Sequence, residues 1–176
     1  MIIPNLLLIA GTGTKSGKTT IACRIIEQIR HPRLVAIKIT PHFHETTPGL
    51  ALINEHEGYS IYKETDPGST KDTSRMLNAG ASDVYFAKVT DGSLYKAFSE
   101  IMKKVPANTP VICESPALRY FVDPGLFVIM SSEAINKQKD INELIKLPHV
   151  KYSVQELAKM KVIPLSFING KWIYEG

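Results

Sequence analysis

The chain of 176 residues holds only two cysteines and one tryptophan, and it has no long apolar run. Cys23 and Cys113 belong to no CxxC or CxxH pattern, so we expect two reduced, buried thiols. A membrane-spanning helix needs about 20 consecutive apolar residues, and no segment approaches that length. The sequence therefore argues against a disulfide-rich scaffold, a structural zinc module and a membrane-spanning protein.

Runs of lysine or arginine are also lacking, and no aromatic residues are interleaved with basic ones, which argues against a nucleic-acid partner. The net charge of +4 comes from 21 basic and 17 acidic residues, and the basic excess is uneven. Six basic residues but only one acidic residue, Glu27, lie in the first 40 positions. This concentration of positive charge favours an anionic ligand near the start of the chain.

The N-terminal stretch MIIPNLLLIA is apolar but short, and it lacks a positively charged leader and a small-residue cleavage site. We therefore expect a β-strand there and a cytoplasmic protein. With 44% hydrophobic residues, the chain is long enough for one packed core. The expected organisation is one domain over residues 1–176, with residues 153–176 as a helix and hairpin extension.

A glycine-rich turn follows the apolar residues 6–10 and precedes a helix-like segment at 19–30. Strand, turn and helix in this order are the context of a phosphate-binding loop, or Walker A motif, in which backbone N–H groups and the helix N-terminus bind phosphate. Lys18 is predicted to reach the β- and γ-phosphates, Thr19 to bind magnesium and Thr20 to donate to an inner phosphate. The predicted phosphate-binding residues are Gly13, Thr14, Lys15, Ser16, Gly17, Lys18, Thr19 and Thr20.

This loop is a variant of the standard pattern, because Thr12 stands where a glycine is usual. Gly11 and Gly13 flank that position, and we expect them to supply the flexibility. The bound ligand is predicted to be a purine nucleotide, GTP or ATP, with magnesium.

Apolar segments alternate with helical periodicity along the chain, which predicts a three-layer, doubly wound α/β fold with a mainly parallel sheet of the P-loop NTPase type. Residues 41–69 are polar, and we expect a long irregular segment with one short strand at 59–62. Asn169-Gly170 between two apolar runs predicts a C-terminal β-hairpin, either as a sheet edge or as an oligomer contact that would make a homodimer. The predicted strands are 34–39, 83–89, 111–113 and 126–130, and the helices are 71–79, 93–105, 141–147 and 154–160.

Acidic and basic residues at strand ends are candidates for chemistry, because ligands of open α/β sheets bind at the carboxyl ends of the strands. Glu114 follows a buried strand and is expected to hold a magnesium-bound water or to orient a nucleophile. Asp72 is a second candidate, and Arg75, one turn later on the same helix face, is expected to pair with it or with a phosphate. Lys38 ends its strand and suggests an anionic second substrate. The predicted catalytic residues are thus Lys18, Glu114 and Asp72, and the predicted metal ligands are Thr19, Glu114 and Asp72.

Two weaker patterns stand apart from the loop. The histidines and glutamates at His42, His44, Glu45, His56 and Glu57 suggest a divalent metal site, but they lack zinc-site spacing and are more typical of a solvated loop. Residues 136–140, Asn-Lys-Gln-Lys-Asp, are similar to the guanine-reading pattern Asn-Lys-x-Asp with the aspartate one residue too far.

Three further segments carry a family resemblance. They are Lys38-Ile39-Thr40-Pro41-His42, Lys71-Asp72-Thr73-Ser74-Arg75 with the following Asn78-Ala79-Gly80-Ala81, and the strand that ends in Glu114. Over residues 5–130 they resemble the molybdopterin-guanine dinucleotide biosynthesis B proteins, although Ile39 and Pro41 replace two histidines and Ser115-Pro116 replaces a glycine. The resemblance implies slow GTP hydrolysis beside a nucleotidyltransferase partner that attaches GMP to the molybdenum cofactor.

The segment Gly11-Thr12-Gly13-Thr14 is also similar to the loops of dethiobiotin synthetase and the cobyrinic acid amidating enzymes. That likeness implies an ATP-dependent ligase or kinase that phosphorylates a carboxylate. A module that senses nucleotide without chemistry is the third reading that the sequence leaves open.

Overall fold

The protein is described by a computed structural model that covers residues 1–41, 46–133 and 140–176. Eight strands form one sheet in the order β3-β4-β5-β2-β6-β1-β7-β8. The six strands from β5 to β8 are parallel, while β4 pairs antiparallel with β5 and with β3. The main-sheet strands are β1 (Ile2–Gly11), β2 (Val35–Thr40), β3 (Leu50–His56), β4 (Tyr59–Glu64), β5 (Asp83–Val89), β6 (Val111–Glu114), β7 (Asp123–Ser131) and β8 (Val150–Ser153).

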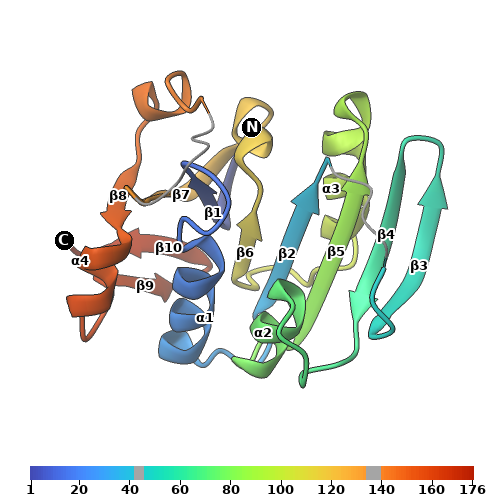
Figure 1. Cartoon of the computed structure of the whole chain (residues 1–176), viewed down its shortest axis with the longest axis horizontal. Helices are drawn as coiled ribbons and strands as arrows, with labels where there is room; N and C mark the ends of the chain where they lie inside the picture. Colours follow the sequence, from blue (N-terminus) through green and yellow to red (C-terminus); the bar gives the residue numbers. More distant parts are fainter. Residues whose placement is uncertain (42–45, 134–139) are drawn as a thin grey trace.

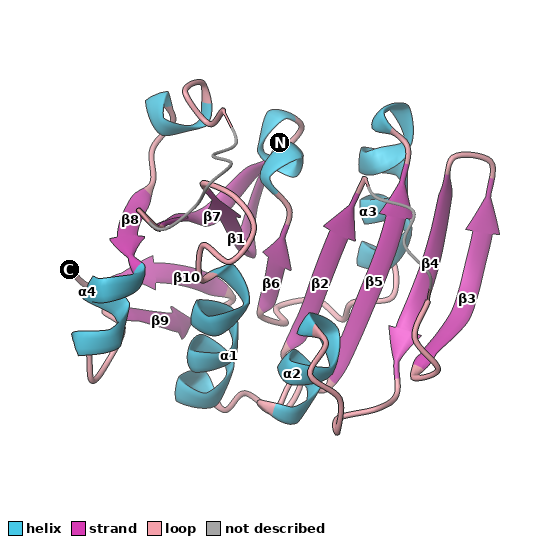
Figure 2. Cartoon of the chain, in the orientation of Figure 1, coloured by secondary structure: helices cyan, strands magenta, loops and turns pink. Residues whose placement is uncertain are grey.

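Helices cover both faces of this sheet, as Figures 1 and 2 show. One face packs against α1, α2 and α4 in a core that includes Ile25 and Met76, and the other face packs against α3 in a core that includes Phe98. The α-helices are α1 (Lys18–Ile29), α2 (Asp72–Asn78), α3 (Leu94–Met102) and α4 (Val154–Lys159), and the 3-10 helices are η1 (Asp91–Ser93), η2 (Pro116–Tyr120) and η3 (Leu144–Lys146). In residues 1–41, 46–133 and 140–176, no helix is both long and apolar enough to span a bilayer.

In the sheet β6 lies between β1 and β2, although along the chain it follows both of them. The carboxyl ends of these three strands therefore lie together, beside the N-terminus of α1. The α/β class and the mostly parallel sheet that the sequence predicts are confirmed.

The C-terminal hairpin is also confirmed, with β9 (Leu165–Ile168) and β10 (Lys171–Tyr174) antiparallel. Asn169 and Gly170 have φ values of 51° and 75°, as a type I′ turn requires. The hairpin is a separate two-stranded sheet and not an edge of the main one. The buried Trp172 indole N–H donates to the carbonyl oxygens of Asn5 (2.9 Å) and Val111 (3.2 Å), so the hairpin packs over β1 and β6.

Two predicted segments are wrong. The short strand expected at 59–62 is confirmed as part of β4, but residues 50–56, expected to be irregular, form β3 and pair with it in a hairpin with Gly58 (φ 89°) in its turn. Most of β3 is exposed, so its sequence carries no apolar alternation. Within residues 141–147, expected to be a helix, the structure has only the short η3, and the four-residue strand β8 follows it.

Both cysteines are free thiols, and Cys113 is fully buried, whereas Cys23 is only partly so. Burial raises the pKa of the Cys23 thiol to about 11, and the pKa of Cys113 is raised as well, again mainly by burial. Both groups are thus neutral thiols at physiological pH, as the lack of a metal-binding pattern suggests.

Candidate functional site

The loop between β1 and α1 has an unusual backbone. Lys15 has a φ of 59° and Gly17, the N-cap of α1, has a φ of 89°, so both adopt the left-handed conformation. A Cβ atom on Gly11 would lie 2.1 Å from the Ser16 hydroxyl oxygen and 2.8 Å from Lys18 Cγ. Gly11 therefore allows the close approach of strand and loop that a glycine at position 12 would give in the standard pattern.

Lys18 is folded over this loop. Its ammonium donates to the carbonyl oxygen of Gly13 (2.7 Å) and to the Ser16 hydroxyl (3.2 Å), and the buried Ser16 hydroxyl itself donates to the same carbonyl (2.8 Å). The N-cap of α1 supplies no side-chain hydrogen bond to the first turn of the helix. An ammonium group and an uncapped helix N-terminus thus lie side by side, which is the arrangement that binds anions.

Glu114 lies beside the next residue of the helix. The Thr19 hydroxyl donates to Glu114 Oε2 at 2.9 Å, and both side chains are buried, with Glu114 only 5% exposed. Glu114 is opposite Lys38 in the parallel register of β2 and β6, and the Lys38 ammonium is 3.5 Å from Glu114 Oε1. The two oxygens of a buried carboxylate therefore each have a partner, as a buried charge requires.

Lys38 bridges two carboxylates, because its ammonium also forms an ion pair with Asp72 at the start of α2. Burial disfavours the charged ammonium, but the charge of Glu114 and the hydrogen bond to Asp72 outweigh it, and the pKa of Lys38 is raised. Burial likewise opposes ionisation of Asp72, yet the hydrogen bond and charge of Lys38 prevail and the pKa of Asp72 is lowered. Lys38 and Asp72 are therefore both favoured in their charged forms.

Arg75 completes the polar cluster one turn after Asp72. Its guanidinium donates from Nη2 to the Thr20 hydroxyl (3.3 Å), and Nη1 is 3.9 Å from Asp72 Oδ1. Both Arg75 and Asp72 are about two-fifths exposed, at 41% and 40%, so water screens this contact. The guanidinium thus lies beside α1 and is partly exposed to solvent.

These residues line one cleft of about 720 Å³ at the carboxyl ends of β1, β2 and β6, which we name the carboxyl-end cleft. The structure brings together all the residues predicted for phosphate, magnesium and catalysis: eleven line this cleft, and Gly13 lies beneath it as the acceptor for Lys18. The eleven are Thr14, Lys15, Ser16, Gly17, Lys18, Thr19, Thr20, Lys38, Asp72, Arg75 and Glu114.

The second metal pattern is not supported in the described part of the chain. Outside residues 42–45 and 134–139, no group of three or more His, Cys, Asp or Glu side chains is arranged to hold a metal ion. The exposed His56 lies against the Tyr59 ring, with centroids 5.1 Å apart. His42, His44 and Glu45 lie outside the described residues, as does most of the guanine-like segment, of which only Asp140 is described.

Magnesium would fit the cleft in a different way. The ion commonly keeps several waters and uses one or two protein oxygens together with substrate phosphates. The Thr19 hydroxyl and the Glu114 carboxylate, in direct contact, are such oxygens, and the Asp72 carboxylate lies near the same hydroxyl. A cluster of three carboxylates is not needed for this donor set.

No family model, curated protein or solved structure matches this chain. The functional interpretation therefore depends on the geometry of the cleft and on the sequence patterns that point to it.

Several residues that line the cleft are not among the predicted site residues. Phe86 and Leu50 extend the cleft beyond Lys38, and Val154 from α4 forms its wall near Gly17. No local signal identifies these residues, since strand pairing and helix packing bring them there.

Glu64 is a further residue that the sequence does not identify, and it supports the site without lining the cleft. This carboxylate is 3% exposed and accepts hydrogen bonds from the Thr73 hydroxyl (2.6 Å) and from the backbone N–H groups of Thr65 (3.1 Å) and Asp66 (3.0 Å). Thr73 follows Asp72 directly in α2. Glu64 thereby fixes the helix turn that carries Asp72.

Proposed function

We propose that this protein binds a purine nucleoside triphosphate, with GTP favoured over ATP, together with magnesium, and hydrolyses it slowly. The single observation that carries the proposal is the contact between Thr19, at the start of α1, and the buried Glu114 at the end of the neighbouring strand. A helix N-terminus with a lysine, next to a hydroxyl and a carboxylate, offers separate groups for phosphate and for a hard cation. Few other ligands would use all of these groups together.

The residues of the cleft have distinct roles in this proposal. The Lys18 ammonium exchanges its contacts with Gly13 and Ser16 for phosphate oxygens, and the loop N–H groups stabilise the charge that develops in the transition state. Thr19 and Glu114 would hold magnesium, which would supply positive charge to neutralise the phosphates. Glu114 orients the attacking water, and Lys38 pairs with both Glu114 and Asp72.

An accessory role beside a protein partner follows from the resemblance to the molybdopterin-guanine dinucleotide biosynthesis B proteins. In this role the nucleotide-bound protein associates with its partner, a nucleotidyltransferase, and slow hydrolysis limits how long the complex lasts. The polar cluster supports slow turnover, because both oxygens of Glu114 already contact Thr19 or Lys38, and one of these contacts must be exchanged before Glu114 can orient a water.

A second candidate function is an ATP-dependent kinase or ligase that phosphorylates a carboxylate. It is favoured by one observation, the extension of the cleft past Lys38 over Phe86 and Leu50, which a triphosphate does not need. In that case Lys38 would bind the acceptor carboxylate. A nucleotide sensor without chemistry is the third candidate, and it requires the same binding site but no turnover.

The test is isothermal titration with hydrolysis-resistant analogues of GTP and ATP, with magnesium or with EDTA. We expect magnesium-dependent binding and tighter binding of the GTP analogue. Tighter binding of the ATP analogue, with hydrolysis stimulated by a small carboxylic acid, would favour the kinase or ligase. Failure of both analogues to bind would contradict all three candidates.

A further inference from the structure

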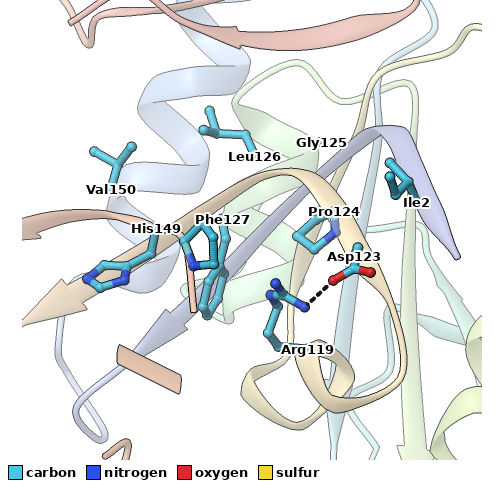
Figure 3. A pocket seen from close by; sticks show the side chains of 10 residues that line it. Ile2, Arg119, Asp123, Pro124, Gly125, Leu126, Phe127, His149 and Val150 are labelled. Atoms are coloured by element: carbon cyan, nitrogen blue, oxygen red, sulfur yellow. Dashed lines mark hydrogen bonds and ion pairs between the residues drawn. The ribbon is translucent and has the colours of Figure 1, made fainter. Parts of the chain in front are cut away.

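A second cavity, of about 420 Å³, lies at the amino ends of β1, β7 and β8, and we name it the amino-end cavity. Its wall is mostly apolar, and the polar side chains in it are Arg119, Asp123 and His149 (Figure 3). The apolar part consists of Ile2, Pro124, Leu126, Phe127, Pro148 and Val150. Its volume is within the range of small-molecule sites, which are typically apolar with a few placed polar groups.

The cavity is distant from the carboxyl-end cleft. Ile2 pairs with Asp123 at one end of β1, and the phosphate-binding loop follows Gly11 at the other. Ten residues of strand, at about 3.3 Å each, separate the two by roughly 30 Å. A ligand in the amino-end cavity is therefore independent of the function proposed for the cleft.

Arg119 is held rigidly in the cavity wall. It extends from η2, whose neighbouring residue Leu118 is fully buried, and its Nη1 donates to the Val122 carbonyl (3.0 Å) and to Asp123 Oδ1 (2.8 Å). The guanidinium carbon is 5.6 Å from the centre of the Phe127 ring, within the range of a cation–π contact. Figure 3 shows Phe127 between Arg119 and His149.

The same guanidinium has an unused donor. The Arg119 side chain is only 10% exposed, and among the described residues no group accepts a hydrogen bond from its buried Nε. Both hydrogen bonds of the guanidinium that we find leave from Nη1. A buried N–H without an acceptor costs about 1–3 kcal/mol, and native proteins rarely leave such a group unpaired. Nε itself is covered, and Nη2 beside it also makes no hydrogen bond among the described residues but is not fully buried, so Nη2 is the atom of this edge that a ligand would meet first.

We propose that the amino-end cavity binds a small monocarboxylate with an apolar or aromatic body. A carboxylate matches the side-on edge of a guanidinium, where Nε and Nη2 point in the same direction. Asp123 takes the other edge through Nη1, and since it is 56% exposed, water screens its charge from a second carboxylate. The apolar body of the ligand packs on Phe127, Leu126 and Val150.

His149 adds a second polar group near the ligand. Its Nδ1 is 2.7 Å from the Leu147 carbonyl, so in the neutral ring Nδ1 carries the proton and donates. The ring lies edge-on to Phe127, with centroids 6.4 Å apart. The imidazole thus borders the aromatic wall and leaves Arg119 as the anion-binding group.

The test uses benzoate as the probe, with amide chemical shifts of the full-length wild-type protein as the readout. We expect saturable shifts confined to residues around Phe127, Val150 and Arg119. Benzyl alcohol, which lacks the charge, and inorganic phosphate, which lacks the apolar body, are the comparison ligands. Equal binding of either one, or no saturable shift at millimolar benzoate, would overturn the proposal.

Variants then locate the anion-binding group. Arg119→Met should weaken benzoate binding about tenfold or more, and Arg119→Lys should restore only part of it, because lysine keeps the charge but not the two-donor edge. Lys18→Ala should leave benzoate binding unchanged, which separates this cavity from the phosphate-binding loop. Unchanged binding in a folded Arg119→Met protein, or loss in Lys18→Ala, would contradict the assignment, and the wild-type shift map remains decisive if the Arg119 variants do not fold.

Discussion

The two ends of β1 carry polar sites of different character. At its carboxyl end, Lys38 and Glu114 each have more than one partner, and the charges of Lys38, Glu114 and Asp72 compensate one another across two strands and a helix. At its amino end, Arg119 pairs with the carboxylate of Asp123, and its Nε has no acceptor within the described part of the chain. Under the proposed function, a charged ligand at the first site exchanges contacts with the protein, while the second site has a donor left over. We propose a ligand for both sites, although the buried charges are paired in one and a buried donor is unpaired in the other. Pairing of buried charges therefore does not by itself distinguish a binding site from a structural network.

The largest effect that would sharpen this contrast is expected from Lys18→Ala. Removing the ammonium should weaken nucleotide binding by about 100-fold or more, since hydrogen bonds to charged groups contribute about 1.5–3 kcal/mol each. Lys15→Ala, at an exposed position of the same loop, is the matched control and should lower affinity less than tenfold. Titration calorimetry measures both. Equal losses in the two variants would mean that only the general positive charge of the loop matters.

The next effect concerns turnover at the same end of the sheet. Glu114→Gln keeps the shape of the side chain and the contact with Thr19 but removes the charge that orients water. We expect hydrolysis to fall by about 100-fold while nucleotide affinity changes little. Phosphate release under single-turnover conditions is the measurement, and Glu100→Gln, on the exposed side of α3, is the control. A rate unaffected by Glu114→Gln would favour the sensor without chemistry.

The contrast between the two ends also explains what the sequence can predict. Lys18 and Thr19 are found from the sequence because strand, glycine turn and helix follow one another locally. Glu114 and Lys38 are found because each stands at the end of an apolar strand. Their contact is not, since it depends on the parallel register of β2 and β6, which are 70 residues or more apart along the chain.

The missed elements have the same physical reason. Five of the seven residues of β3 are exposed, and β8 has four residues, so neither carries a periodic apolar signal. Each strand forms because a neighbour offers unpaired backbone groups, which is a tertiary effect. The amino-end cavity depends on β8 for Val150, and the anchor of α2 depends on β4 for Glu64. A turn with local chemistry, Asn169-Gly170, is by contrast predicted with both flanking strands.

A smaller effect is expected on stability from Lys38→Met. The variant leaves the buried Glu114 without its cation, and the free energy of unfolding should fall by about 1–3 kcal/mol, below the full cost of breaking a buried pair because Asp72 is partly exposed. Lys63→Met, which breaks an exposed pair with Asp83, is the matched control and should cost under about 1 kcal/mol. Urea unfolding gives both values. A loss in Lys38→Met no larger than in the control would mean that the bridge contributes nothing to the fold.

The ion pairs of Lys38 can also be tested by the pH dependence of the difference in unfolding free energy between wild type and Lys38→Met. The pKa of Asp72 is lowered from 3.8, so its contribution is present above pH 3.8 and is lost as the pH falls through the lower folded value. The pKa of Lys38 is raised from 10.5, so its contribution is complete below pH 10.5 and is lost as the pH rises through the higher folded value. The difference in unfolding free energy between wild type and Lys38→Met should therefore stay constant between pH 3.8 and pH 10.5. A decline centred near neutral pH would show that another group titrates in the bridge.

The smallest effect is expected from the hairpin, which covers the amino-end half of β1 on the face that α1 shares. Trp172→Phe removes the indole N–H that donates to Asn5 and Val111, and it keeps most of the apolar contact. The unfolding free energy should fall by about 1–2 kcal/mol, as for one hydrogen bond with its acceptors left buried. Lys171→Ala, exposed on the same strand, is the control and should be nearly neutral. Nucleotide affinity should not change in either variant, because the Trp172 indole bonds to Asn5 and Val111, at the opposite end of β1 from the loop. A matching loss of nucleotide binding in Trp172→Phe would mean that the two ends of β1 are coupled through the strand.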